Sequence, residues 1–269
     1  MTEARAEDLV PGTGQLRFPL RAYEYWVVSY RRVWRGSVVS SLLNPVLYLT
    51  ALGVGLGRLV NKGSHPLGVS YVAYVAPGML AAVAMQVAAF ESSWPVMAAI
   101  RWTRQYQAML ATPLRVRDVM TGHMLYVMSR VAVACAVYLA VLAAFGTLHS
   151  PLAVLVLPLS ILIGAAFSAP IAAIAAWAPK DNVLSSLFRF GIMPLFLFSG
   201  TFFPLTRLPL ALRYFAYATP LWHGVDLARH LTLGTATLGT SLVHVAYLLV
   251  FAAIGVVLAL RSFTRTLVR

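Results

Sequence analysis

The chain has 269 residues, of which 60% are hydrophobic and only 11% charged, and its formal net charge is +13. So few charged residues could not cover the surface of a water-soluble globule of this size, which excludes an ordinary soluble domain. The apolar stretches reach about 20 residues, enough to cross a hydrocarbon core of roughly 30 Å, so the sequence predicts an all-α integral membrane protein.

Six membrane-spanning helices are predicted. In chain order they cover residues 37–59, 71–100, 119–145, 152–177, 184–203 and 241–260. Lys and Arg are concentrated at both termini and in alternate loops, and the positive-inside rule places those segments in the cytoplasm. We interpret the basic residues as topology signals rather than as a nucleic-acid site. The chain then divides into a cytoplasmic segment (1–36), a transmembrane domain (37–262) and a basic cytoplasmic tail (263–269).

The second span is too long for one straight crossing, because residues 71–100 as a helix would reach about 45 Å. We expect a kink at Pro95, with Glu91 at the cytoplasmic interface. Arg130 falls inside the third span, where an ionisable side chain should face protein or water. Our hypothesis is that Glu91 and Arg130 lie toward the cytoplasmic ends of their helices and help to shape an inner gate.

Residues 20–35 show the spacing of an amphipathic helix. Its apolar side holds Leu20, Tyr23, Val27, Tyr30 and Trp34, and its polar side holds Arg21, Glu24, Arg31, Arg32 and Arg35. Such a helix is predicted to lie in the cytoplasmic interface, with its aromatic rings at headgroup depth. Two interpretations remain open: a plain membrane anchor, or a helix that also contacts a cytoplasmic partner.

A second amphipathic helix is predicted in the loop after span two. Trp102, Tyr106, Met109 and Leu110 recur at helical spacing, Arg101, Arg104 and Gln105 lie on other faces, and Pro113 ends the helix. An apolar face bordered by arginines suits a groove on a soluble partner and equally suits a lipid surface.

Residues 204–234 are too charged for a seventh crossing exposed to lipid. Pro209 is predicted to open one short helix, Thr219 and Pro220 to begin a second, and Gly234 to end it. Both helices should dip into the outer leaflet under cover of protein, as extracellular re-entrant helices. His223, Asp226 and His230 follow a spacing of i, i+3, i+7, but the absence of a fourth ligand favours polar contacts over a metal site.

Several common motifs are absent from the sequence. The only lysines, Lys62 and Lys180, do not belong to a GxxxxGK[ST] phosphate loop, and neither GxSxG nor HExxH occurs. The single cysteine, Cys135, lies in an apolar run and is interpreted as a packing residue. Gly53 and Gly57 form a GxxxG pair in the first span, a pattern typical of helix packing.

Two stretches resemble those of one transporter family. The first is Gln105-Tyr106-Gln107-Ala108-Met109-Leu110-Ala111-Thr112-Pro113-Leu114; the second is Leu197-Phe198-Ser199-Gly200-Thr201-Phe202-Phe203-Pro204, followed by Leu208-Pro209 and Ala218-Thr219-Pro220-Leu221. They resemble the coupling segment and the end of span five in ABC-2 permeases, the membrane subunits of ABC exporters. The branch is that of the nodulation lipo-oligosaccharide and daunorubicin-type exporters.

The resemblance implies a plasma (inner) membrane permease that exports an amphiphilic or lipid-like substrate such as a drug, glycolipid or lipo-oligosaccharide. It implies a second copy of this or a homologous permease, and two copies of a separate ABC ATP-binding subunit that carry the ATP and Mg. No catalytic, cofactor or metal site is expected on this chain. The expected coupling residues are Arg101, Trp102, Arg104, Gln105, Tyr106, Met109, Leu110 and Pro113.

The remaining candidate residues fall into three groups. The interfacial helix would act through Tyr23, Val27, Tyr30, Arg31 and Trp34; the gate or pathway candidates are Glu91, Arg130, Phe198, Phe202 and Phe203; the re-entrant helices carry Pro209, Pro220, His223 and Asp226. Two alternatives stay open. An ATP-independent secondary transporter or channel would transport without a partner, and an intramembrane lipid-modifying enzyme would use His223, Asp226 and His230 as its polar centre.

Overall fold

The computed structural model describes residues 17–32, 34–51, 55 and 69–268, and in this part of the chain every regular element is a helix. The elements are α1 (Arg17–Tyr30), α2 (Trp34–Thr50), α4 (Tyr71–Glu91), α5 (Trp94–Met97), η2 (Ala98–Trp102), α6 (Gln105–Leu110), α7 (Val116–Ala144), η3 (Pro151–Leu155), α8 (Val156–Trp177), α9 (Asn182–Leu187), η4 (Phe188–Ile192), α10 (Met193–Phe198), η5 (Leu205–Arg207), α11 (Leu210–Tyr217), α12 (Pro220–Leu233) and α13 (Leu238–Leu267). The prediction of an all-α membrane protein is confirmed for these residues.

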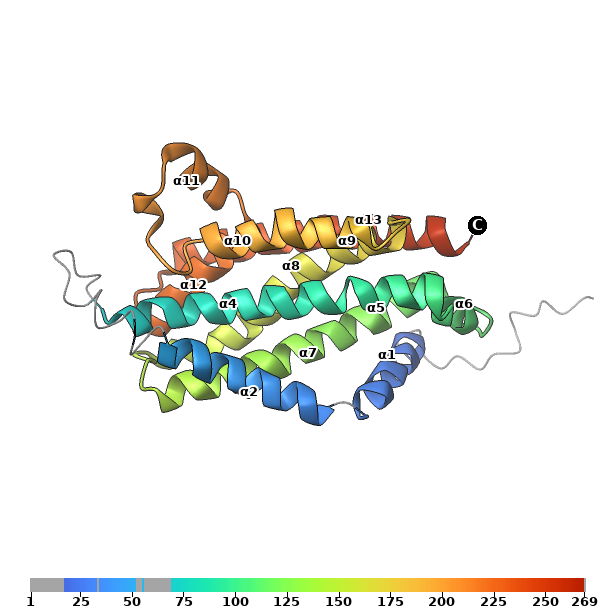
Figure 1. Cartoon of the computed structure of the whole chain (residues 1–269), viewed down its shortest axis with the longest axis horizontal. Helices are drawn as coiled ribbons and strands as arrows, with labels where there is room; N and C mark the ends of the chain where they lie inside the picture. The colour runs from blue at the N-terminus through green and yellow to red at the C-terminus, as the bar shows by residue number, and fades with distance from the viewer. Residues whose placement is uncertain (1–16, 33, 52–54, 56–68, 269) are drawn as a thin grey trace, which may run out of the picture.

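The long helices lie along one common axis (Figure 1). Helix α4 runs through the middle and contacts α7, α8 and α12, while α13 packs along α8. Small residues make α4 a suitable centre, because Ala76, Ala81, Ala84 and Ala88 are fully buried and let neighbouring helices approach closely. We call the end of the bundle with α1, α6 and the C-terminus the α6 end, and the end with α11 and α12 the α12 end.

Four helical segments of the described chain are long and apolar enough to cross a membrane: Tyr71–Trp102, Val116–Ala144, Pro151–Trp177 and Leu238–Leu267. They correspond to the second, third, fourth and sixth predicted spans. The fifth, Asn182–Phe198, is an apolar helix of fewer than 18 residues. The first predicted span is described only in part, and Gly53 and Gly57 lie outside the described residues. The count of six spans therefore stays a prediction.

The kink of the second span lies slightly before the predicted position. Helix α4 ends at Glu91, Ser92 and Ser93 interrupt it, and Pro95 stands in the first turn of α5. We expected the segment around Glu91 to face a cytoplasmic interface. That position stays a prediction; within the protein, Ser92 and Ser93 are fully buried, and the Ser93 hydroxyl donates to the Phe90 carbonyl at 2.9 Å. The break is thus inside the helical bundle, where side chains satisfy the freed backbone groups.

The predicted interfacial helix differs from the observed one in extent and in orientation. Helix α1 ends at Tyr30, so Trp34 belongs to α2 and is 46% exposed, and Leu20 is exposed as well. Tyr23, Val27 and Tyr30 of the predicted apolar side are half-buried against the core, and Ala22, which the pattern did not select, is only 1% exposed against Gly122 of α7. A Cβ on Gly122 would lie 2.5 Å from the Ala22 Cβ, so only glycine permits this approach. Helix α1 is bound to protein along one face.

Helices α11 and α12 begin at the predicted residues, and α12 also ends at the predicted one. Pro209 is the N-cap of α11, and the Thr219 hydroxyl caps α12 by accepting from the Trp222 amide, with Pro220 in the first turn. Gly234 ends α12 with φ +76°, a left-handed conformation that favours glycine. Helix α13 continues to Leu267, through most of the residues assigned to the basic tail.

Candidate functional site: both ends of the helical bundle

Tyr106 of α6 is completely buried at the α6 end of the bundle. Its hydroxyl lies 3.0 Å from Nδ1 of His123, whose Nε2 lies 3.1 Å from the backbone carbonyl of Glu91. Because a carbonyl can only accept, His123 donates a hydrogen bond through Nε2. Its Nδ1 therefore accepts a hydrogen bond from the Tyr106 hydroxyl. Burial raises the pKa of the Tyr106 hydroxyl, which keeps it protonated as a donor. These bonds connect α6 to α7 and to the end of α4.

Aromatic rings extend this connection to two further helices. Trp26 of α1 lies edge-on to His123 with ring centroids 4.6 Å apart, and it stacks on Tyr126 at 5.7 Å. Phe263 of α13 lies 5.7 Å from Tyr106. We call Trp26, Tyr106, His123, Tyr126 and Phe263 the aromatic junction. The aromatic junction joins α1, α6, α7 and α13. Trp26 was not among the residues predicted from the sequence, because its position falls between the two helix faces assigned from periodicity.

The predicted amphipathic helix over 101–114 is wrong in its extent. Arg104 has φ +50°, in the left-handed region, and it separates η2 from α6. Trp102 therefore stays on η2 and is 64% exposed, whereas Tyr106 turns into the protein. The two aromatic side chains do not share a face, because a left-handed residue changes the direction of the chain. Tyr106 offers no surface to a partner in this arrangement.

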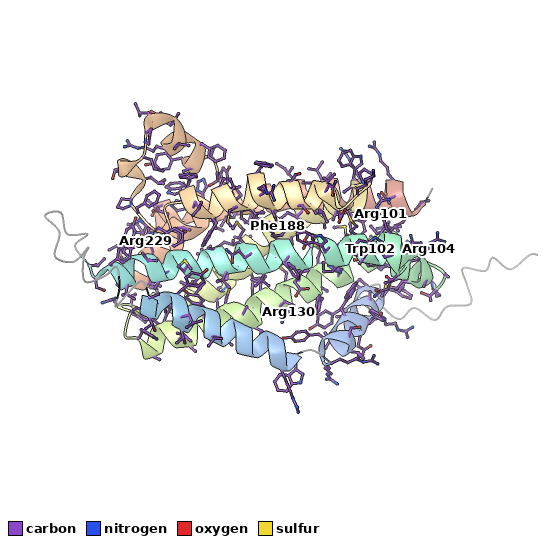
Figure 2. All side chains as sticks on the ribbon, in the orientation of Figure 1. Arg101, Trp102, Arg104, Arg130, Phe188 and Arg229 are labelled. Atoms are coloured by element: carbon purple, nitrogen blue, oxygen red, sulfur yellow. The ribbon has the colours of Figure 1, made fainter. Side chains whose placement is uncertain are left out.

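The exposed part of the loop is basic. Arg101, Trp102 and Arg104 lie together at the α6 end (Figure 2). Arg101 donates to the Trp177 carbonyl at 3.4 Å, and Gln107 donates to the Ile100 carbonyl at 2.8 Å. A cavity of about 430 Å³ opens here, lined by Ile100, Arg101, Arg104, Gln107 and Thr266. Among the other predicted coupling residues, Gln105, Met109 and Leu110 are half-buried and Pro113 is exposed.

Glu91 and Arg130, named together as gate candidates but not predicted to be in contact, form an ion pair. The Arg130 Nε lies 3.0 Å from the Glu91 Oε1, and each side chain is only 15% exposed. The Arg130 guanidinium also lies 4.1 Å from the centre of the Tyr30 ring of α1. The pair thus joins α4 to α7, and Tyr30 of α1 contacts its arginine. Such pairing is expected, because ionisable residues inside membrane helices pair with one another.

A polar stripe runs along the first half of the apolar segment Asn182–Phe198. Asn182, Ser185, Ser186 and Arg189 recur at i, i+3, i+4 and i+7, which is one side of a helix, and all four are exposed. Together with Phe190 they line a cavity of about 250 Å³. From the sequence, Arg189 was interpreted only as one of the basic topology signals. The helical spacing of the four polar residues was the signal that would have found the stripe.

Helices α12 and α13 meet at a chain of histidines and one carboxylate. The two Nδ1 atoms of His223 and His244 lie 2.8 Å apart, and His244 Nε2 lies 3.3 Å from the Asp226 carboxylate, which also faces His230 at 3.5 Å. Burial, followed by the nearby His244, lowers the pKa of His223 to about 4. His244 was missed because it stands within the last predicted span. Among the described residues, no three His, Cys, Asp or Glu side chains are arranged to hold a metal ion.

Arg229 connects α12 to the start of α4 and to the loop after α10. Its guanidinium donates to the Tyr74 carbonyl at 3.1 Å and to the Gly200 carbonyl at 2.8 Å, and it lies 3.8 Å from the centre of the Tyr74 ring. Gly200 has φ +80°, so this loop turns where a glycine is favoured. From the sequence, Arg229 was noted only as a charged residue. Its contacts could not be predicted, because its hydrogen-bond partners are backbone carbonyls.

The aromatic gate candidates lie far from the ion pair. The carbonyl of Phe202 accepts from the Tyr71 hydroxyl at 3.2 Å, and its ring packs edge-on to Phe196 at 5.1 Å. Tyr71 begins α4 and Glu91 ends it, so about 30 Å of helix separates them. Phe198 and Phe203 are half-buried at the same α12 end. Glu91 and Arg130 therefore lie apart from these phenylalanines, and the role of either group in a gate or pathway stays a prediction.

Comparison with known proteins agrees with this architecture. Residues 24–233 match the model of the family described as ABC-2 type transporter. Nodulation protein J of Rhizobium leguminosarum bv. trifolii is 32% identical over 251 residues, which cover 91% of this chain and 94% of the relative. Nodulation protein J of Neorhizobium galegae is 32% identical over 216 residues, covering 78% and 81% respectively. The chain therefore belongs to the ABC-2 type transporter family.

Proposed function

We propose that this chain is the transmembrane subunit of an ATP-driven ABC exporter and forms the path for an amphiphilic or lipid-like substrate, such as a drug, a glycolipid or a lipo-oligosaccharide. Membership of the ABC-2 type transporter family supports the class. The observation that carries the path is the polar stripe of Asn182, Ser185, Ser186 and Arg189. An exposed arginine on a membrane helix is costly against lipid, so the stripe faces water or another protein surface.

A second copy of this or a homologous permease would place another stripe opposite the first. The segment Asn182–Phe198 would span only about 25 Å at 1.5 Å per residue, which is shorter than a typical hydrocarbon core. Short spans favour helix association over exposure to lipid. In a dimer, two polar stripes would line an aqueous passage for the polar part of an amphiphile.

The proposed topology has six spans, with α2 as the first and Asn182–Phe198 as the fifth, in the plasma (inner) membrane. Arg101, Arg104 and Arg115 lie in the loop at the α6 end, and Arg265 lies in the last turn of α13 there. By the positive-inside rule this end and both termini are cytoplasmic, and the α12 end with its re-entrant helices is extracellular.

Coupling to a separate ABC ATP-binding subunit, present in two copies that hold ATP and Mg, would occur at the exposed basic part of the 101–104 loop. Arg101 and Arg104 supply positive charge there for acidic side chains of the partner. Force on α6 would then pass through Tyr106 and the aromatic junction to α1, α7 and α13. ATP can shift the spans only if the partner's contacts differ between the inward and outward states.

The test is transport by vesicles containing this chain together with an ATP-binding subunit encoded beside it. We expect Arg189→Leu to lower ATP-dependent export about tenfold or more, while binding of the ATP-binding subunit is retained. Arg261→Leu, which changes an exposed arginine of α13, is the matched control. Unchanged export by Arg189→Leu would remove the stripe from the path.

The same vesicles separate the alternatives. Transport by the purified chain without an ATP-binding subunit would favour a secondary transporter or channel. Turnover of a lipid by the chain alone, abolished by His223→Gln, would favour the intramembrane enzyme.

A further inference from the structure

A cavity of about 500 Å³ lies at the α12 end, between the start of α8, one side of α12 and the start of α13. Its lining is almost entirely aliphatic and includes Leu155, Leu159, Leu227, Leu231 and Val245; its polar members are Thr237 and Ser241. The volume falls within the range of small-molecule sites, about 300–1,000 Å³. We call it the leucine groove.

The leucine groove opens onto an apolar surface. Its rim residues Leu152 and Leu238 are 41% and 85% exposed, and the neighbouring Val154 and Leu242 are 69% and 65% exposed. Both α8 and α13 belong to segments that are long and apolar enough to cross a membrane. Beyond Thr237 and Ser241 the groove is therefore expected to face hydrocarbon, and its occupant must be apolar there.

The polar lining residues lie at the beginning of α13. Thr237 is the N-cap of this helix, and its hydroxyl lies 2.8 Å from that of Thr240. Deeper along the groove the walls come from Leu159 and Leu231, which are 5% and 6% exposed. A molecule with a polar head near Thr237 and Ser241 and a flexible hydrocarbon tail beside the leucines matches this gradient.

The lining also distinguishes a lipid tail from a protein surface. Interfaces between helices in a membrane are enriched in Gly, Ala, Ser and Thr, which let two backbones approach closely. Seven of the twelve described lining residues are leucines, and these twelve include no aromatic and no charged side chain. A groove lined mainly by bulky leucines, with few small residues, fits a single hydrocarbon chain better than a second copy of this protein.

We propose that the leucine groove binds one acyl chain of a membrane phospholipid, with the headgroup beside Thr237 and Ser241. Leu227 and Leu231 come from α12, whose other residues include Asp226, His223 and Arg229. A bound acyl chain would therefore fill the space between α12 and the two long helices. It would hold α12 in the position in which the Arg229 hydrogen bonds and the His223–His244 contact form.

The test uses phosphatidylcholine vesicles that contain a small fraction of phosphatidylcholine with a diazirine at mid-chain. After illumination, adducts are mapped by mass spectrometry. We expect adducts at Leu159 and Leu231 at least about tenfold above those at Leu249 and Val250, which are exposed on α13 outside the groove. Equal labelling of the two sets would show ordinary surrounding lipid and overturn the proposal.

Ala236→Trp fills the groove from its lining, and Ala253→Trp places the same ring on the exposed surface of α13. We expect the first to abolish groove adducts and the second to leave them. Adducts that persist in Ala236→Trp would contradict the proposal. Cross-links between two copies through Ser241→Cys would also contradict it, because a second copy would then cover the groove. If Ala236→Trp does not fold, the map of the unchanged chain decides. No ATP-binding subunit and no transport are needed, so failure here leaves the proposed function standing.

Discussion

Tyr106 is a buried structural residue of α6, with its hydroxyl on His123 and its ring beside Phe263. Tyr106→Ala should lower the free energy of unfolding by about 3–5 kcal/mol, as for other large buried aromatic side chains. Tyr106→Phe removes only the hydrogen bond and should cost about 1 kcal/mol. Thermal unfolding in detergent measures both. Melting of Tyr106→Ala at the temperature of the unchanged chain would contradict the buried position.

Glu91 and Arg130 should be energetically coupled. Replacing either one with leucine leaves the charge of the other in a largely buried setting, whereas replacing both removes two buried charges together. The double variant should therefore lose less stability than the sum of the single variants, by about 0.5–3 kcal/mol. A double-mutant cycle of unfolding free energies measures this difference. Strict additivity would show that the contact carries no energy.

His223 should make stability depend on pH. Its pKa in the folded protein, about 4, lies below the ordinary value of 6.5, so the unfolded chain binds the proton more readily. The contribution is present above about pH 6.5 and is lost as the pH falls toward 4. Melting temperatures between these values should fall more steeply for the unchanged chain than for His223→Gln. Parallel curves would show that another group is responsible.

Helix α1 depends on one glycine of α7 for its position. A Cβ at Gly122 would lie 2.7 Å from the Pro19 carbonyl and 2.9 Å from the Tyr23 amide, and backbone atoms cannot move aside without shifting the helix. Gly122→Ala should therefore release α1 and speed tryptic cleavage after Arg21. Gly239→Ala adds the same methyl group to α13 in open space and is the control. Equal cleavage rates in the two variants would mean that α1 tolerates the displacement.

Helical periodicity predicted where α1 and α6 lie, and the positions of proline and glycine predicted α11 and α12, but neither signal gave the whole buried side. In α1 the predicted residues Tyr23, Val27 and Tyr30 are half-buried against the core, but Ala22 and Trp26, which the pattern did not select, also contact α7. In a membrane protein, lipid and protein interiors are both apolar, so hydrophobicity does not distinguish the side that packs on a helix. Small residues such as Gly122 carry that information.

At the scale of the whole molecule, the proposed dimer makes a direct prediction. Cys135 is the single cysteine and is buried, so an introduced cysteine would be the reactive one. Ser186→Cys on the polar stripe should cross-link two copies, while Leu258→Cys, exposed on α13, should not. Gel electrophoresis after mild oxidation measures the product. Cross-linking only through Leu258→Cys would place the second copy on another face.

The sequence by itself determined that this protein lies in a membrane. It also determined where the long helices lie and where the chain turns at Pro209, Thr219 and Gly234. These depend on composition, apolar length and local backbone preference, all of which act over neighbouring residues. Tertiary structure alone decided that Glu91 meets Arg130, that His223 meets His244 and that Arg229 meets two backbone carbonyls. Those contacts join residues distant in the chain, and they form because buried polar groups must find partners inside a low-dielectric bundle.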